Sequence, residues 1–342
     1  MGTAVVREVE EAAAACLDFL RSRQSTEGSW TDWDLPPGRS SMWTTAYVGC
    51  QLARLRPRLQ GSASEAMRRT ACWLTEHELP DGGWGYDGVV GCDADSTAHA
   101  IVAITLSGGP VADRSCRRLE SFQQPDGGFS TYAADDGLGS WGESHADVTP
   151  VAAHALLLVR GRADVALARA IAYVTRRRNG AGLWDSFWWS TPLYATRASL
   201  ALLAAADARL DLASTRASLL EIKPESAFER ALLVDCLGLA GAGTGSTARR
   251  LVEALVGEQL GDGSWASVPS LRIPDRTCAA PWRETLTGPL YADPDRLFTS
   301  ATVLGALSRA MGPGGPRLAA PQPSSARSAS AACRRSGPTS TR

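Results

Sequence analysis

Two carboxyl groups lie close together in the sequence, at Asp93 and Asp95, and an apolar segment with helical spacing follows them. Each carboxyl disfavours ionisation of the other, so such a pair tends to retain one proton near neutral pH. A carboxyl that stays protonated in an apolar cavity can serve as a general acid. The structural alternative is that Asp93 to Thr97 only caps a helix, since Asp and Ser are favoured N-cap residues.

Aromatic residues are the second chemical signal, because the chain contains 11 Trp. They are dense in the segment Trp184-Asp185-Ser186-Phe187-Trp188-Trp189, which Leu193-Tyr194-Ala195-Thr196 follows. Indole and phenyl faces stabilise positive charge without acting as nucleophiles. We expect some of these rings to line a cavity in which a cation develops. The alternative is that they fill an ordinary core.

The segments that must position these residues contain a repeat. Five copies share one spacing, in which a helix end is followed by a polar residue, a glycine turn and an aromatic residue. The copies are Phe19-Leu20…Gln24…Gly28…Trp30, Trp73-Leu74…Glu78…Gly82…Trp84, Arg118-Leu119…Gln123…Gly127…Phe129, Tyr173-Val174…Arg178…Gly182…Trp184 and Ala254-Leu255…Gln259…Gly263…Trp265. We expect each aromatic ring to fold back and pack on the amide of the preceding helix.

This repeat resembles the QW repeat of the squalene and oxidosqualene cyclases, over about residues 10–311. Between the copies lie apolar segments with helical periods, at 42–55, 95–107, 147–160, 191–206, 227–241 and 297–310. One copy is missing near 213–224. The pattern predicts an all-α protein, an α6–α6 toroidal barrel of six inner and six outer helices within residues 1–312. Residues 313–342 are rich in Pro, Ser, Ala and Arg, which predicts a disordered tail.

The carboxyl pair takes part in the same resemblance. The segment Asp93-Ala94-Asp95-Ser96-Thr97-Ala98 resembles the Asp-x-Asp-Asp-Thr-Ala motif of squalene-hopene cyclases and class II diterpene cyclases. Ser96 departs from that form and is closer to the Asp-Cys-Thr-Ala form of oxidosqualene cyclases. The resemblance implies that Asp95 donates a proton while Asp93 keeps the pair protonated. It implies that Trp188 is the first aromatic to stabilise cations, with further substrate-binding candidates at Trp189, Tyr194, Phe187, Trp141, Phe298 and Trp43.

The partner of the acid departs from the family pattern. Trp141-Gly142-Glu143 followed by Asp147-Val148-Thr149 resembles the segment that opens the next inner helix in squalene-hopene cyclases, so Asp147 is a candidate catalytic residue. The family's histidine would stand at Val151. His154 lies one turn further along, and His99 lies one turn beyond Asp95, so either could replace that histidine. The alternative for both is a histidine that is merely satisfied within a helix bundle.

These resemblances imply a class II terpene cyclase, in which Asp95 protonates a linear isoprenoid or prenylated substrate. They imply no cofactor, with Mg²⁺ relevant only to a diphosphate substrate. Two alternatives stay open: a non-catalytic isoprenoid-binding or scaffold protein, and a cyclase of another polyene. Because no second barrel precedes the acid, either a homo-oligomer or partner closes the cavity, or the substrate enters from the open end. Asp235-Cys236 lacks the ligand spacing of the zinc-holding prenyltransferases, which share the barrel.

Composition sets the remaining expectations. A net charge of −1 disfavours a nucleic-acid partner. The eight cysteines are scattered without a Cys-x-x-Cys pair, which favours free thiols in the cytoplasm. The longest apolar runs are too short to span a bilayer, although an amphiphilic substrate could bring the protein to a membrane surface.

Overall fold

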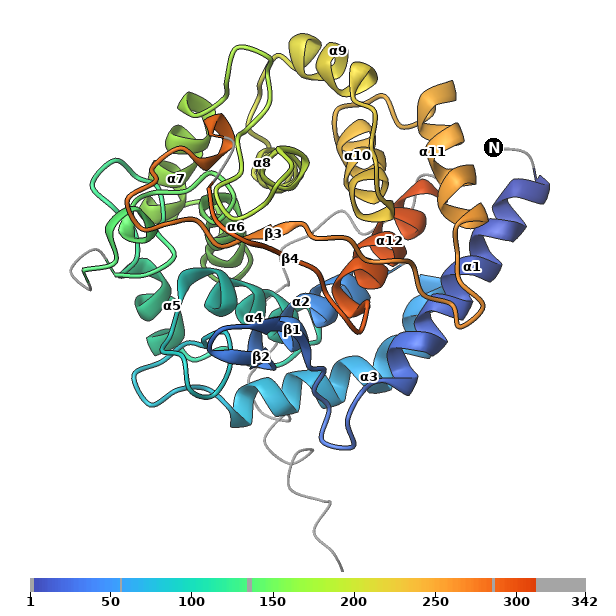
Figure 1. Cartoon of the computed structure of the whole chain (residues 1–342). Helices are drawn as coiled ribbons and strands as arrows, with labels where there is room; N and C mark the ends of the chain where they lie inside the picture. Colours follow the sequence, from blue (N-terminus) through green and yellow to red (C-terminus); the bar gives the residue numbers. More distant parts are fainter. Residues whose placement is uncertain (1–2, 56, 134–136, 285–286, 312–342) are drawn as a thin grey trace, which may run out of the picture.

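Helices in two concentric rings make up the part of the chain that the computed structural model describes, residues 3–55, 57–133, 137–284 and 287–311 (Figure 1). The inner helices are α2 (Met42–Ala53), α4 (Ala94–Leu106), α6 (Thr149–Arg160), α8 (Leu193–Ala205), α10 (Ala227–Leu239) and α12 (Leu297–Ala310). The outer helices are α1 (Thr3–Ser22), α3 (Pro57–Glu76), α5 (Asp113–Glu120), α7 (Val165–Arg176), α9 (Ala213–Glu221) and α11 (Ser246–Gly257). Helix α12 packs on α2 and α11 packs on α1, so both rings close. The predicted α6–α6 barrel is confirmed.

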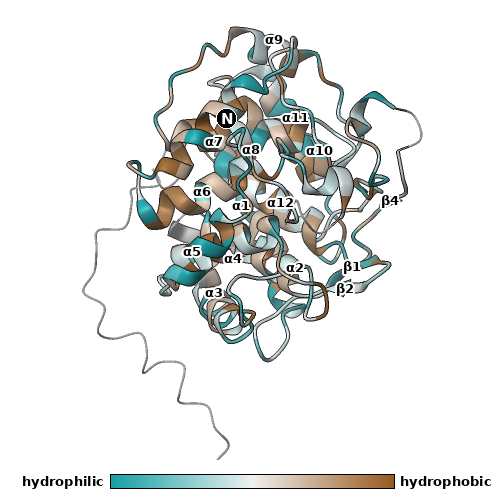
Figure 2. Cartoon of the chain, turned by 90° about the vertical axis from the view of Figure 1, so that its left-hand side faces the viewer, coloured by the Kyte–Doolittle hydropathy of each residue, from teal (hydrophilic) through white to brown (hydrophobic). Residues whose placement is uncertain are grey.

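Burial explains which helices lie inside. All residues of α2 are buried, whereas α11 buries only Ala248, Val252 and Leu255. A helix that is apolar on every side needs neighbours all round, while an amphipathic helix covers a core with one face. Outer helices such as α5 accordingly carry hydrophilic residues at the surface (Figure 2). The expected tail at 313–342 lies outside the described residues, and so does the end of the predicted barrel domain at residue 312.

The repeat joins each outer helix to the loop that follows it. The indole N–H groups of four repeat tryptophans donate to carbonyl oxygens at the ends of the preceding outer helices, over 2.7–2.8 Å. The pairs are Trp30 with Leu20, Trp84 with Leu74, Trp184 with Val174 and Trp265 with Leu255. The last carbonyls of a helix have no partner within it, so these bonds cap the helix while the ring is buried. The rings fold back as the spacing predicts.

The polar residue of the repeat links neighbouring outer helices, which the spacing did not predict. The side-chain amide of Gln24 donates to Ala66 of α3, that of Gln123 to Ala166 of α7, and that of Gln259 to Ala12 of α1. Glu78 and Arg178 make the equivalent connection through ionic or hydroxyl partners on α5 and α9. The bond from Gln259 to Ala12 connects the last outer helix with the first.

Two short antiparallel ribbons lie at the end of the barrel where the inner helices begin. Strand β1 (Asp32–Leu35) pairs with β2 (Gly38–Ser40), which leads directly into α2. Strand β3 (Leu271–Arg272) pairs with β4 (Leu290–Tyr291), and Leu271 also bridges to Trp189 ahead of α8. Short 3₁₀ turns at η1 (Gly139–Gly142) and η2 (Pro281–Arg283) complete this end. Among the described residues, no helix has both the length and the apolar character to cross a bilayer.

Candidate active site

A pocket opens at the end of the barrel where the inner helices begin. Its empty volume, with open solvent at the mouth included, is about 570 Å³. The lining residues are Leu35, Trp43, Tyr86, Asp93, Asp95, Ser96, Thr131, Tyr132, Asp147, Val148, Trp188, Trp189, Tyr194, Leu271 and Ile273. Three carboxyl groups therefore face a wall that is otherwise mostly aromatic and aliphatic. In such surroundings the neutral form of a carboxyl is favoured.

Asp95 lies in the first turn of α4, and its carboxyl is held by Trp43 of α2. The indole N–H of Trp43 donates to Oδ2 of Asp95 over 2.7 Å. Burial raises the pKa of Asp95 to about 7, and the hydrogen bond from Trp43 acts in the opposite direction because it favours the carboxylate. In a large fraction of the molecules, Asp95 thus keeps its proton at neutral pH. The Trp43 N–H is already placed to stabilise the carboxylate that forms when the proton leaves.

Asp93 is the residue that caps the helix. Its carboxylate oxygens accept hydrogen bonds from the backbone N–H and the hydroxyl of Ser96, each over 2.7 Å. Burial raises the pKa of Asp93 to about 7, and the charge of Asp95 adds to the rise. Asp93 is thus the N-cap of α4, and the carboxyl of Asp95 faces the pocket.

The two candidate histidines differ in their relation to the acid. In His99, Nδ1 lies 2.9 Å from the backbone carbonyl oxygen of Asp95 and 3.5 Å from Oδ1 of its carboxyl. Burial lowers the pKa of His99 to about 3, so its ring is neutral and Nδ1 donates to that carbonyl. His154 is equally buried, and its Nε2 has no hydrogen-bond partner within the described residues. Only His99 lies beside Asp95.

Asp147 precedes α6 and lines the same pocket. Its Oδ2 accepts a hydrogen bond from the backbone N–H of Trp188 over 2.8 Å. Its Oδ1 is buried and has no hydrogen-bond partner in the described parts of the chain. Burial raises the pKa of Asp147 to about 7. The site therefore holds a further carboxyl that can carry or accept a proton.

Four of the seven predicted aromatic residues line the pocket, namely Trp43, Trp188, Trp189 and Tyr194. Trp189 stacks on Tyr194 with ring centroids 4.4 Å apart. The indole N–H of Trp188 donates to the hydroxyl of Thr131 over 2.7 Å, which fixes the orientation of the ring. The walls are thus formed by rings that neighbouring groups hold in place.

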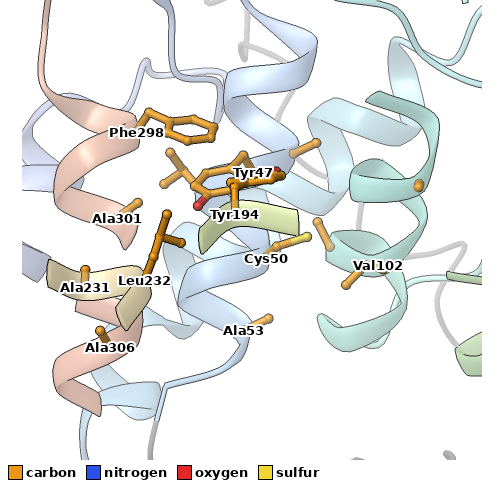
Figure 3. Close-up of a cluster of buried hydrophobic side chains, with 14 of the residues drawn as sticks. Tyr47, Cys50, Ala53, Val102, Tyr194, Ala231, Leu232, Phe298, Ala301 and Ala306 are labelled. Atoms are coloured by element: carbon orange, nitrogen blue, oxygen red, sulfur yellow. The ribbon is translucent and has the colours of Figure 1, made fainter. Parts of the chain in front are cut away.

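The other three predicted aromatics are not among the residues that line this pocket. Phe298 stacks on Tyr47 at 3.7 Å between ring centroids and lies 5.0 Å from Trp189, so it supports the lining from the core (Figure 3). Phe187 and Trp141 each meet Trp188 edge to face. These three rings thus contact the lining rings Trp188 and Trp189, and their role in substrate binding stays a prediction.

Several lining residues carried no signal in the sequence. Leu35 and Leu271 belong to the strands β1 and β3, and Ile273 directly follows β3; such short strands have no helical period to reveal them. Tyr86 and Tyr132 stand in loops. In the sequence, Tyr86 lies between Trp84 of a repeat copy and Asp93. This position close to the acid pair is the one hint that could have identified it. In the described part of the chain, no group of three or more His, Cys, Asp or Glu is placed to hold a metal ion.

The fold is that of the class II, or type II, terpene cyclases. No protein-family model matches the chain. Among solved structures, the type II terpene cyclase MstE from Scytonema, in a variant bound to its substrate geranylgeranyl dihydroxybenzoate, is 25% identical with a TM-score of 0.78. The alignment covers 91% of this chain and 99% of that one. Another structure of MstE contains its product, merosterolic acid A. A single barrel of this size therefore holds a prenylated substrate in MstE.

Two curated proteins match over shorter stretches. Terpentedienyl-diphosphate synthase from Kitasatospora griseola is 32% identical over 94 residues, 27% of this chain and 17% of that protein. Drimenyl diphosphate synthase from Streptantibioticus cattleyicolor is 31% identical over 124 residues, 35% of this chain and 23% of that protein. The matched stretches span less than a quarter of each of these longer relatives.

Proposed function

We propose that this chain is a class II terpene cyclase that starts cyclisation by protonating a linear isoprenoid or prenylated substrate. The observation that carries the proposal is the Asp95 carboxyl, which is buried in an aromatic pocket and has a raised pKa and a hydrogen-bond donor on Oδ2. The O–H bond of Asp95 breaks as a C–H bond forms at the terminal alkene, which leaves a tertiary cation. Neighbouring double bonds then attack in turn and close the rings.

The pocket wall suits the intermediates of such a reaction. Trp43, Trp188 and Trp189 present ring faces and edges that attract positive charge and offer no nucleophile to trap it. The neighbouring rings that contact them hold these positions, and a fixed environment stabilises a transition state without reorganising first. Proton transfer from Asp95 needs no metal. Mg²⁺ would matter only for binding a diphosphate head group.

The substrate class follows from what the similar proteins act on. MstE binds a geranylgeranyl chain on an aromatic head group, and the two curated relatives are named for diphosphates. We propose a prenyl chain whose terminal alkene reaches Asp95, with the head group toward the mouth of the pocket.

A labelling assay tests the activity. The full chain is incubated in D₂O with geranylgeranyl dihydroxybenzoate, geranylgeraniol or geranylgeranyl diphosphate, and the products are analysed by mass spectrometry and NMR. We expect a cyclic isomer with one deuterium at the former terminal alkene, because Asp95 exchanges with solvent before it protonates the chain. Conversion without incorporation of deuterium, or binding of all three compounds without conversion, would contradict the proposal.

Removing the donor on the acid should slow the reaction without preventing binding. Trp43→Phe keeps an aromatic face but deletes the indole N–H that stabilises the Asp95 carboxylate. A hydrogen bond to a charged group contributes about 1.5–3 kcal/mol, so we expect kcat to fall roughly 10- to 100-fold with little change in KM.

The pH profile distinguishes this effect from a mere loss of packing. A donor to the carboxylate lowers the pKa of Asp95, so its removal raises that pKa. The alkaline limb of the rate profile, where the acid loses its proton, should therefore move to higher pH in Trp43→Phe. Trp189→Phe changes another lining ring, one without a hydrogen bond to Asp95 among the described residues, and should leave that limb in place. An unchanged limb in Trp43→Phe would rule out the role assigned to the indole.

A further inference from the structure

Trp188, a ring of the pocket wall, is held both at its backbone and at its side chain. Its backbone N–H donates to Oδ2 of Asp147 over 2.8 Å, and its carbonyl oxygen accepts from the N–H of Arg272 over 2.6 Å. Its indole N–H donates to the hydroxyl of Thr131 over 2.7 Å. Hydrogen bonds at three atoms leave the side chain little freedom to turn, so its partners set the orientation of this lining ring.

The hydrogen bonds continue beyond Thr131 to a buried histidine. The Thr131 hydroxyl lies 3.2 Å from Nδ1 of His145, and Nε2 of His145 lies 2.9 Å from the carbonyl oxygen of Ser140. Burial lowers the pKa of His145 to about 3, so the ring is neutral and has a single N–H. Because a carbonyl oxygen can only accept, that N–H is on Nε2. Nδ1 is therefore the acceptor for the Thr131 hydroxyl.

Each hydrogen bond of this chain consequently has one direction. An indole nitrogen only donates, and a hydroxyl has one proton to donate. Trp188 thus donates to Thr131, which donates to His145. The ring of His145 in turn donates to Ser140. Thr131 is 6% exposed and His145 is 4% exposed, so water competes little with these bonds, and bonds in such a chain polarise and strengthen one another.

Thr131 and His145 are themselves tied to the helix of the acid and to the repeat. The backbone carbonyl oxygen of Thr131 accepts from the N–H of Ala94, the residue before Asp95, over 2.9 Å. The backbone N–H of His145 donates to the carbonyl oxygen of Phe129, the aromatic residue of the third repeat copy, over 3.0 Å. The indole that Thr131 holds is thereby placed relative to the acid through a single residue.

We infer that Thr131 and His145 are positioning residues that orient the Trp188 indole and thereby determine which product the cyclase forms, an inference that rests on the proposed function. The face of an indole attracts positive charge, so its orientation determines where along the folded chain a cation is stabilised. The ring closure that places charge at that point is favoured over its alternatives, because its transition state is bound more tightly. No proton moves along the chain of hydrogen bonds, which acts through geometry alone.

A role in stability alone explains less of this arrangement. An aliphatic side chain and a phenyl ring would fill the same space without polar groups that need partners. Instead, the imidazole of His145 stacks on Phe187 at 3.9 Å between ring centroids and uses its nitrogens to hold Thr131. A buried polar chain whose members are all hydrogen-bonded selects one arrangement of side chains. Here that selection ends on a ring of the pocket.

The test compares variants on the compound that the wild type converts in the labelling assay. Thr131→Val keeps the shape of the side chain and removes the hydroxyl, so the Trp188 indole loses its acceptor. The net contribution of a neutral hydrogen bond corresponds to roughly two- to tenfold, and we expect the ratio of main to minor products to change by such a factor. Substrate consumption should change less, because Asp95 and its donor are intact. Thr131→Ser restores the hydroxyl and should restore the product ratio.

Variants of the histidine keep the test decisive if Thr131→Val folds poorly. His145→Phe keeps a ring to stack on Phe187 and removes Nδ1, so it should shift the product ratio in the same direction as Thr131→Val. His145→Asn offers an oxygen in place of Nδ1 and should shift the ratio less. Thr215→Val is the matched control, since it removes a buried threonine hydroxyl that donates to Gly182 over 2.6 Å outside the pocket lining. Its product ratio should equal that of the wild type.

NMR reads the hydrogen bond independently of turnover. In protein labelled with ¹⁵N at the tryptophan indoles, the Trp188 signal is identified by its loss in Trp188→Phe. We expect its N–H proton to move upfield and to exchange faster with water in Thr131→Val, and to keep its position in Thr215→Val.

Three results would overturn the inference and leave the cyclase function intact. The first is an indole signal that Thr131→Val does not move. The second is a product ratio that neither Thr131→Val nor His145→Phe changes. The third is a changed ratio that Thr131→Ser fails to restore, because that would indicate a loss of packing. Failure of the wild type to cyclise any substrate would instead refute the proposed function, and the inference with it.

Discussion

Asp95→Asn is expected to fold like the wild type and to lose turnover by at least about a thousandfold. General acids typically contribute about a hundred- to ten-thousand-fold, and an unactivated alkene has few other routes to a cation, which places the effect at the upper end. The asparagine keeps the size of the side chain and an oxygen that can accept from Trp43. It cannot deliver an acidic proton.

Binding separates the loss of the acid from damage to the pocket. Affinity for an unreactive analogue, such as a substrate with a saturated terminal alkene, should stay within a fewfold of the wild type, because the acid acts mainly in the transition state. Asp293→Asn serves as the control, since it changes another buried carboxyl outside the lining. Comparable turnover by Asp95→Asn and the wild type would exclude Asp95 as the proton donor.

The same substitution has a predictable effect on stability. The folded pKa of Asp95 is about 7, against an ordinary value of 3.8, so the folded state holds this proton more tightly than the unfolded state does. The unfolded state therefore gains by ionising as the pH rises between these values, and the protein loses stability over that window. Asp95→Asn removes this penalty. Above pH 7 we expect the variant to melt at the same temperature as the wild type or at a higher one. Such a gain is typical when a residue required for activity lowers the stability of the folded state.

The fold could be predicted because its determinants are local. Each inner helix was visible as a period of small and apolar residues, and the observed helices begin and end within two residues of the expected segments. The repeat was visible as a spacing. What the spacing could not reveal is the partner of its polar residue, since Gln259 bonds to Ala12, 247 positions away in the sequence.

The site was predictable to the extent that its residues stand in or next to helices. Asp95, Trp188 and Tyr194 belong to recognisable segments and line the pocket. The bond between Trp43 and Asp95 was not predicted, because it depends on the side-chain rotamers of residues 52 positions apart. Leu271 and Ile273 were not predicted, because they lie in and directly after a strand of two residues, which is too short to show a period.

A network on α10 illustrates how a motif with chemical potential can be structural. Asp235 is 3% exposed, and its oxygens accept from Nε of Arg197 of α8 over 2.9 Å and from Nε of Arg309 of α12 over 2.8 Å. Burial alone would raise the pKa of Asp235, but the two guanidiniums outweigh it and the net pKa is lowered. Both oxygens are therefore engaged in joining three consecutive inner helices, which explains the Asp235-Cys236 pair without a zinc ion.

Asp235→Ala should accordingly be among the most destabilising single changes in the barrel. It leaves Arg197, whose side chain is 9% exposed, as an uncompensated buried cation. Breaking a buried pair costs about 3–5 kcal/mol, and we expect about 3 kcal/mol because Arg309 keeps 39% of its side chain exposed and can rehydrate. The free energy of unfolding, measured by denaturant titration, gives this value.

Asp262→Ala breaks the more exposed pair with Arg296 and should cost less than about 1 kcal/mol. Equal costs for the two variants would show that the network joining α8, α10 and α12 does not stabilise the inner ring. A wild-type protein that keeps its full stability as the pH falls well below 3.8 would point the same way, because the contribution of a carboxylate with a lowered pKa is lost when it is protonated.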